Sequence, residues 1–173
     1  VRYGQYDGKI DYKQIASLEE KERNKVIDEL VKEFNLKKEE TGFFGCDDKI
    51  LEFEVSSATV ELAAQAVGTE PARIAKTMSF MVNESPILIL LAGDVKIDNP
   101  KYKAKFHTKA KMLSFEEVEP IIGHGVGGVC PFGINDGIPV YLDESLKRFE
   151  TVFPAVGSGN SAIELNLDEL YKY

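Results

Sequence analysis

One lysine stands where an aliphatic side chain would be expected. The run from Ile74 to Val82 alternates as a β-strand does, and its even positions are Ile74, Lys76, Met78, Phe80 and Val82. A lysine on that otherwise apolar face loses hydration, so its ammonium needs an anion, a carbonyl oxygen or a cavity. Two readings stay open: a pocket lysine that binds a charged substrate group, or a strand-end lysine whose stem packs while its ammonium reaches water.

A glycine-rich segment is the second feature that could do chemistry. Five of the chain's 14 glycines fall between Gly123 and Gly133. Such a run adopts backbone conformations closed to other residues and lets a ligand approach the main chain. Its N–H groups could face an anion or a developing oxyanion. A long turn between sheet elements is the alternative, and Pro131 with Gly133 favours a fixed loop.

Cys130 lies within this segment, six residues after His124. A nucleophilic cysteine needs a base, and His124 is the nearest histidine, so a cysteine-dependent acyl transferase is one reading. A packed, non-catalytic thiol is the other, and we favour it. His107 and His124 have no partner at metal-ligand spacing, so no metal site is predicted.

Two further segments carry polar groups. Residues 157–161, Gly-Ser-Gly-Asn-Ser, could contact a ligand or simply close a hairpin. Residues 101–111 contain five lysines and no acid. On a helix, Lys101, Lys105 and Lys109 would form one stripe, either a phosphate-binding patch or a solvated face.

Composition limits the class of protein. The chain has 173 residues, 43% apolar and 29% charged, with a formal charge of −8. This length fits one domain with at most a small appendage, and the composition excludes a disordered tail, a collagen-like fibre and a disulfide scaffold. The acidic balance argues against non-specific coating of nucleic acid. One local basic patch can still bind a nucleic acid weakly, with a shallow salt dependence.

Cysteine usage and hydropathy indicate a compartment. Cys46 and Cys130 are expected to be free thiols of a reducing compartment. The longest apolar run, 86–92, is far shorter than a membrane span, and the N-terminus has no signal peptide. We therefore expect a cytoplasmic protein.

The remaining pattern predicts the elements that position these residues. Residues 1–49 are highly charged, and the capping box Ser17-x-x-Glu20 predicts a helix over 18–34 within an N-terminal helical extension. The main domain, 50–173, opens with a half-buried strand over 50–55. A helix capped by Ser56 or Ser57 follows and ends at Gly68.

Later elements set the fold class. Strands over 74–82 and 86–91 form a hairpin, and helices follow over 100–110 and from the capping box Ser114-x-x-Glu117 to Gly123. Three strand-like runs, 139–142, 151–155 and 162–165, precede a helical turn at 167–171. Because strands and helices alternate irregularly, we expect an α+β fold with a mixed sheet rather than a doubly wound parallel one.

Together these segments resemble the YbaK/EbsC family, which is related to the inserted editing domain of bacterial prolyl-tRNA synthetases. The resemblance covers about residues 50–171 and rests on Ile74-Ala75-Lys76-Thr77-Met78, the Gly127–Gly133 loop, Val140–Asp143 and Gly157–Leu165. The Lys-Thr strand followed by the GGV-x-PFG loop is a specific combination. It implies an α+β fold with a mixed, mainly antiparallel, curved and barrel-like sheet surrounded by helices.

The resemblance also implies a site. Lys76 matches the family's essential lysine, and Gly127 and Pro131 match its GxxxP loop, so Lys76, Gly127 and Gly128 are the implied catalytic residues. The implied substrate-binding residues are Thr77, Val129, Cys130, Pro131, Gly157, Ser158, Asn160 and Ser161. The residues proposed to bind tRNA are Lys101, Lys103, Lys105 and Lys109.

The implied function is an aminoacyl-tRNA deacylase acting in trans, with no metal, cofactor or protein nucleophile. A positioned water, aided by the substrate's ribose hydroxyl, would attack the ester while loop N–H groups stabilise the oxyanion. The expected partners are the acceptor end of an aminoacyl-tRNA and an aminoacyl-tRNA synthetase, with no membrane. Many relatives have Ser where this chain has Cys130, and some have a His in the segment that corresponds to residues 157–161, which we call the third loop. These departures leave open a non-catalytic regulator that binds aminoacyl-tRNA or a nucleotide.

Overall fold

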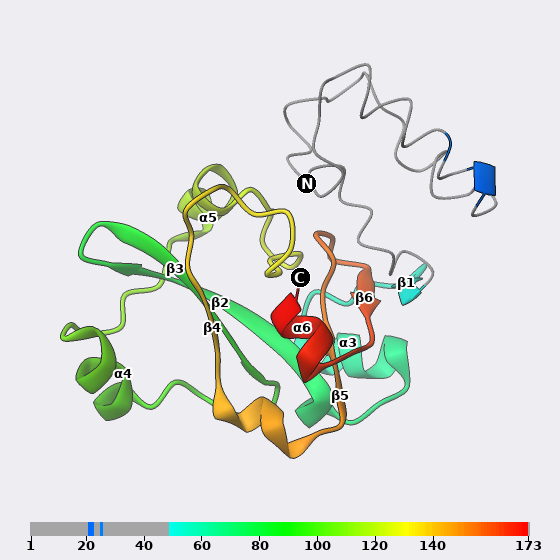
Figure 1. Ribbon diagram of the computed structural model, residues 1–173, viewed down its shortest axis with the longest axis horizontal. Coiled ribbons are helices and arrows are strands. Elements are labelled where there is room, and N and C mark those ends of the chain that lie inside the picture. Colours follow the sequence, from blue (N-terminus) through cyan, green and yellow to red (C-terminus); the bar gives the residue numbers. More distant parts are fainter. Residues whose placement is uncertain (1–20, 23–24, 26–48, 173) are drawn as a thin grey trace. The chain divides into compact units, whose positions relative to one another are not determined.

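The computed structural model describes residues 21–22, 25 and 49–172 (Figure 1). The chain divides into two units between Asp48 and Lys49, and the fold described below is that of the second unit. The helix predicted over 18–34 lies outside the described residues, except that Lys21, Glu22 and Lys25 are helical.

A curled five-stranded mixed sheet forms the centre of this unit, in the order β4-β3-β2-β5-β7. Its strands are β2 (Ile74–Val82), β3 (Ser85–Ala92), β4 (Val140–Leu142), β5 (Thr151–Pro154) and β7 (Leu165–Asn166). The β2–β3 and β5–β7 pairs are antiparallel, whereas β3–β4 and β2–β5 are parallel. A separate antiparallel pair joins β1 (Ile50–Glu52) to β6 (Ser161–Ile163). The expected α+β fold with a curved, mixed, barrel-like sheet is confirmed.

The β2–β3 hairpin is the longest pairing and orders the two faces of the sheet. Its turn has only two residues, Asn83 and Glu84, with φ of 46° and 67°. Two successive positive φ values are those of the tight turn that matches the twist of paired strands. Across the hairpin Lys76 lies opposite Leu91 and Thr77 opposite Leu90. Neighbouring positions of a strand point to opposite faces, so Lys76 and Thr77 face different sides of the sheet.

Each face packs against its own helix. On the Lys76 face, Phe80, Ile87, Ile89 and Leu91 pack with Tyr102 of α4 (Asn99–Phe106). On the Thr77 face, Leu88 and Leu113 pack with Val118 and Ile122 of α5 (Phe115–Ile122). Burying one such side chain contributes about 1.5–3 kcal/mol. The hairpin is therefore held from both sides, and its register is fixed.

The first helix of the unit begins later than predicted. Helix α3 (Val60–Val67) is capped by Thr59, whose Oγ1 accepts a hydrogen bond from the amide of Leu62 at 3.2 Å. The predicted caps, Ser56 and Ser57, are thus wrong. The predicted end is right, since Gly68 has a left-handed φ of 78°.

The ends of β1 and α4 also differ from the predicted ends. Strand β1 ends at Glu52 rather than at 55, although the amide of Phe53 still donates to the carbonyl oxygen of Asn160 at 2.8 Å. Helix α4 ends at Phe106 rather than at 110, with His107 in a left-handed conformation. The predicted capping box of Ser114 and Glu117 at the start of α5 is confirmed.

The chain end divides into two short strands and a helix. The run predicted over 162–165 becomes β6 and β7, separated by the exposed Glu164. Helix α6 (Leu167–Lys172) follows, and single 3-10 turns lie at Pro71–Arg73 (η4) and Glu144–Arg148 (η5). Within the described residues, no helix has both the length and the apolar character that crossing a membrane requires.

Candidate active site

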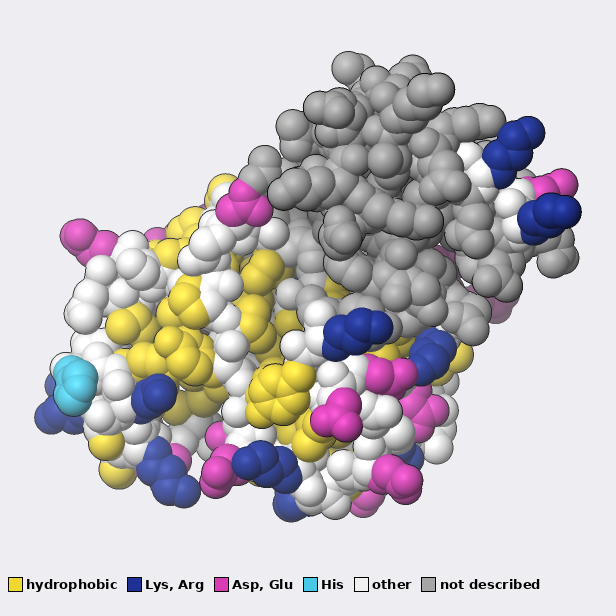
Figure 2. Space-filling view, viewed as in Figure 1, with side chains coloured by type: hydrophobic (Ala, Val, Ile, Leu, Met, Phe, Trp, Pro, Cys, Tyr) yellow, Lys and Arg dark blue, Asp and Glu magenta, His cyan; other side chains and the backbone are white. Residues whose placement is uncertain are grey.

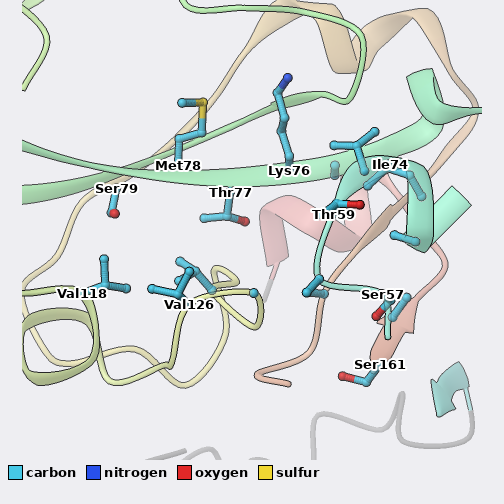
Figure 3. Close-up of a pocket in the computed structure, with 18 of the residues that line it drawn as sticks. Ser57, Thr59, Ile74, Lys76, Thr77, Met78, Ser79, Val118, Val126 and Ser161 are labelled. Carbon is cyan, nitrogen blue, oxygen red and sulfur yellow. The ribbon is translucent and has the colours of Figure 1, made fainter. Parts of the chain in front are cut away.

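A cleft of about 340 Å³ lies between β2 and the glycine-rich loop (Figure 3). Its walls come from segments far apart in the sequence: the stretch before α3, the first two-thirds of β2, the start of α5, the glycine-rich loop and the third loop with β5 and β6. The residues that line it include Ser57, Ala58, Thr59, Lys76, Thr77, Ser79, Met112, Phe115, Val126, Gly127, Val129 and Ser161. The fold thus brings the Lys-Thr strand and the glycine-rich loop to one place.

The two neighbouring residues of the Lys-Thr strand point in opposite directions. Figure 3 shows Lys76 and Met78 on one side of β2, and Thr77 and Ser79 on the other, toward Val118 and Val126. The cross-strand pairs and the two core clusters give the same assignment. Thr77 therefore projects into the space between β2 and the loop, whereas Lys76 borders the cleft from the far side of its strand.

The ammonium of Lys76 is fixed by the chain just after β3. Its Nζ donates a hydrogen bond to the carbonyl oxygen of Gly93 at 2.9 Å. Burial lowers the pKa of this ammonium, while the nearby carboxylates of Asp94 and Glu61 act in the opposite direction. An ammonium has three N–H donors, so two remain for a ligand.

Gly93 is placed by a close approach of two backbones. A Cβ on Gly93 would lie 2.0 Å from the carbonyl oxygen of Pro71. No other residue type fits there without moving the main chain. Next to it, Arg148 Nη1 donates to Asp94 Oδ2 at 3.0 Å, which holds the carboxylate beside Lys76. The carbonyl that positions Lys76 is therefore part of a rigid segment.

The glycine-rich loop turns sharply at the cleft. The amide of Gly128 donates to Gly125 O at 3.0 Å, and Gly127 has a φ of 93°, as at the third position of a type II turn. A Cβ on Gly127 would lie 2.9 Å from the Cβ of Ala58. The turn leaves Val126 at its tip and 53% exposed.

The loop also packs directly on the third loop. A Cβ on Gly128 would lie 2.8 Å from the main-chain atoms of Gly157 and Ser158. The two glycine segments singled out in the sequence therefore touch backbone to backbone. Because the Gly128 amide is already bonded within the turn, it holds the loop rather than facing the cleft. The amide of Gly127 has no such turn bond to another described residue.

Cys130 is sealed behind the loop. It is 1% exposed, its thiol donates to the carbonyl of Phe132 at 3.3 Å, and burial raises the pKa of this thiol to about 11. His124 Nε2 lies 2.6 Å from the same carbonyl oxygen and 3.5 Å from the Cys130 sulfur. A nitrogen that donates to Phe132 O has no lone pair for the thiol proton. The geometry therefore disfavours a Cys-His nucleophile pair.

Two hydroxyl groups at the cleft have no partner. The Oγ of Ser57 and the Oγ1 of Thr77 are buried without a hydrogen-bond partner among the described residues. A buried hydroxyl without a partner costs about 1–3 kcal/mol, so a ligand that supplies one is favoured. Thr77 was predicted to bind substrate, whereas Ser57 was interpreted only as a helix cap. Thr59 caps α3 instead, and nothing in the sequence indicated that Ser57 would lie at the cleft and Thr59 at the helix start.

The sequence-predicted residues divide into two groups. Those that line the cleft are Lys76, Thr77, Gly127, Val129 and Ser161. The others lie behind it or in its supporting loops: Gly128, Cys130, Pro131, Gly157, Ser158 and Asn160. In the third loop the side chains bond to one another and to the chain before α3. Ser158 Oγ is 2.7 Å from Ser161 Oγ, and Asn160 Nδ2 donates to the carbonyl of Phe53 at 3.1 Å.

The predicted tRNA-binding lysines do not line this cleft. Lys101 and Lys105 line a second cavity of about 580 Å³ between α4, β4 and η5, where the carboxylates of Asp98, Asp143 and Glu144 also lie. Lys103 and Lys109 are exposed outside both cavities. The second cavity is thus bordered by both signs of charge.

Metal-ligating groups are scattered over the described part of the chain. Nowhere within it do three His, Cys, Asp or Glu side chains gather closely enough to hold a metal ion.

The fold and cleft match a known class, the aminoacyl-tRNA editing domains. The model of this family matches residues 54–173, so the chain belongs to the family. A relative of Bacillus subtilis (strain 168), the uncharacterized protein YwhH, is 55% identical over 128 residues, which are 73% of this chain and 82% of YwhH.

Proline–tRNA ligases are more distant relatives. The enzyme of Streptococcus equi subsp. equi (strain 4047) is 32% identical over 104 residues, which are 58% of this chain but 16% of the ligase. Among solved structures, a protein described as a proposed trans-editing enzyme for prolyl tRNA synthetase shares the fold with a TM-score of 0.65. The two are 32% identical, over 70% of this chain and 77% of that one. The resemblance found in the sequence is thereby confirmed.

Proposed function

We propose that this chain is an aminoacyl-tRNA deacylase that acts in trans, removing a wrong amino acid from a tRNA charged elsewhere. The observation that carries the proposal is the cleft that Thr77 and Gly127 line, with Lys76 at its border on the other side of β2, in a chain of the editing family. Among the described residues, those that line the cleft lie between positions 57 and 162.

The proposed reaction is ester hydrolysis. A water molecule adds to the carbonyl carbon that joins the amino acid to the terminal ribose, and the carbonyl oxygen becomes an oxyanion. The bond to the ribose oxygen then breaks, and that oxygen leaves with a proton as a hydroxyl group. The free vicinal hydroxyl of the same ribose orients the water. The protein therefore has to contribute little of the entropy cost of positioning that water.

Each cleft residue has a role in this proposal. The amide of Gly127 donates to the oxyanion, since the neighbouring Gly128 amide is engaged in the turn. Lys76 uses its remaining N–H donors to hold a charged group of the terminal nucleotide or the aminoacyl moiety. The unpartnered hydroxyls of Ser57 and Thr77 accept from the ammonium of the amino acid or donate to a ribose oxygen.

The proposed mechanism needs no protein nucleophile. The thiol of Cys130 is buried, and its raised pKa leaves almost no thiolate at neutral pH. An aminoacyl ester is activated and needs less assistance than an amide. The oxyanion donor and the positioned water are therefore the main contributions of the protein, as the family resemblance implies for a reaction without metal or cofactor.

The relatives indicate which tRNA to test first. Several curated relatives are proline–tRNA ligases, so we propose proline tRNA carrying a wrong amino acid as the first substrate and the acceptor end as the part that binds. A synthetase that produces such errors is the proposed partner, and the cytoplasm, where translation occurs, is the proposed location.

The test is a multiple-turnover assay with a panel of mischarged tRNAs, led by proline tRNA. We expect release of free amino acid faster than in buffer, and loss of this release in Lys76→Ala. Tight binding of charged tRNA without release of the amino acid would contradict the proposed deacylase activity and support a non-catalytic regulator. Full activity of Lys76→Ala would remove the proposed site.

A further inference from the structure

Three large apolar side chains stand exposed at the mouth of the cleft. Phe115 is 74% exposed, and Met112 and Val126 are each 53% exposed. All three also line the cleft. On the face drawn in Figure 2, further hydrophobic side chains gather around β3 and β4. We call Met112, Phe115 and Val126 the apolar rim.

The apolar rim is held in place by its surroundings. The amide of Leu113 donates to Ser79 O at 3.2 Å, and the amide of Met81 donates to Lys111 O at 2.8 Å, so residues 111–113 follow the edge of β2. The capping box fixes the start of α5, where the amide of Ser114 donates to Glu117 Oε2 at 2.8 Å. The turn at Gly127 fixes Val126. These side chains are exposed although their backbone is ordered by the fold.

We propose that the apolar rim is a stacking platform for the terminal nucleobase of the substrate, with Phe115 as its principal contact. This inference rests on the proposed function and names a binding residue within it. In an aminoacyl-tRNA the base is joined to the same ribose that carries the ester. When the ester lies at Thr77 and Gly127, the base must therefore lie within one nucleotide's reach, at the mouth of the cleft.

The chemistry of the rim selects a base over other parts of the substrate. An aromatic ring with a thioether and an isopropyl group offers flat apolar contact, and base–aromatic stacking is a strong, sequence-tolerant contact in single-stranded recognition. A phosphate is disfavoured, because Glu116 and Glu117 occupy the first turn of α5 next to Phe115. The face of a nucleobase is uncharged. It is therefore not repelled by these two carboxylates and does not require a cationic side chain to bind.

The experiment compares two hydrolysis-resistant ligands on the full chain. One is 3′-(L-alanylamino)-3′-deoxyadenosine, and the other carries the same alanylamino group on a methyl riboside without a base. Binding is measured by calorimetry. We expect the wild type to bind the adenosine ligand at least about tenfold more tightly, the effect of one stacked base. Phe115→Ala should lose this preference, and Phe115→Trp should keep it.

A matched control is available on another helix. Tyr171 is an aromatic residue of α6 that is 67% exposed, and it does not line the cleft. Tyr171→Ala should leave both affinities unchanged. If Phe115→Ala keeps the adenosine preference, or weakens both ligands equally, the platform is refuted even though tRNA is still hydrolysed. Tighter binding of both ligands by Phe115→Ala would refute it too, by showing that Phe115 covers the cleft.

Discussion

The ammonium of Lys76 is bonded to the carbonyl oxygen of Gly93, 17 residues later in the chain, at 2.9 Å. Of the three partners that an inward lysine could find, an anion, a carbonyl or a cavity, the fold supplies the carbonyl. The bond leaves the side chain half-exposed at the border of the cleft, with donors to spare. Lys76 is thus oriented before any ligand arrives.

The first prediction concerns this lysine. Lys76→Met keeps most of the stem but removes the charge and its donors. We expect deacylation to fall by about 100-fold or more, the effect of losing a charged group that contacts the reacting substrate. The free energy of unfolding should change by less than about 2 kcal/mol, because a water molecule can replace the lysine as the donor to the Gly93 carbonyl. Turnover assays and urea unfolding check the two parts, and a large loss of stability would contradict the assignment.

The second prediction separates two neighbouring glycines. Gly128→Ala places a methyl group against the backbone of Gly157, so we expect a loss of about 1–3 kcal/mol in the free energy of unfolding, together with a displaced loop. Gly125→Ala is the matched control, because a Cβ there has no atom within 4 Å. Its unfolding midpoint and turnover should stay close to wild type. Equal effects of both substitutions would show that the loops do not touch as described.

The third prediction concerns Cys130 and is made in a Cys46→Ser chain. With a thiol pKa of about 11, alkylation by iodoacetamide at pH 8 should be about 200-fold slower than for an ordinary cysteine. Mass spectrometry measures the rate, and denaturant should restore it. Cys130→Ser should keep turnover within a few-fold. Loss of turnover in a folded Cys130→Ser chain would instead support cysteine-dependent acyl transfer.

The fourth prediction concerns an unpartnered hydroxyl. Thr77→Val has the same shape but no hydroxyl, and Thr77 Oγ1 has no partner among the described residues. We expect the free energy of unfolding to stay unchanged or rise by about 1 kcal/mol, while deacylation falls. Thermal unfolding and turnover, measured on the same preparation, test whether stability is kept while activity falls. A less stable variant would mean that the hydroxyl is satisfied in the free protein.

The fifth prediction is a pH dependence. Hydrogen bonds from the backbone and side chain of Ser114 lower the pKa of the Glu117 carboxyl. A lowered pKa in the folded state means that the stabilisation is present above the unfolded value, about 4.3, and is lost as pH falls through the folded value. The Tm difference between wild type and Glu117→Gln should therefore be constant near neutral pH and shrink below about pH 4. A difference that grows on acidification would contradict the capping role.

Local sequence determined the parts whose energetics are local. The alternating strand at 74–82, the capping box at Ser114 and the stop at Gly68 follow from side-chain periodicity and from hydrogen bonds within a few residues. The Lys-Thr strand and the glycine-rich loop were sufficient to indicate the family, which the editing-domain match confirms. Their cooperation at one site stays a proposal.

Tertiary structure decided which groups face the cleft. From the sequence, Ser56 or Ser57 was the predicted cap of this helix. Thr59 caps α3 because packing sets where the helix begins, and this leaves the Ser57 hydroxyl at the cleft. Likewise, the sequence alone presented the five lysines of 101–111 as one basic segment. In the folded chain, Asp143 and Glu144 line the same cavity as two of these lysines, Lys101 and Lys105.

The sequence by itself therefore determined the family, the hairpin and the candidate strand and loops. Only the tertiary structure decided that Lys76 bonds to Gly93, that Gly128 supports the loop while Gly127 faces the cleft, and that Cys130 is sealed away. The reason is physical: periodicity reports which face of an element a residue occupies. Which backbone approaches that face is set by contacts between segments tens of residues apart.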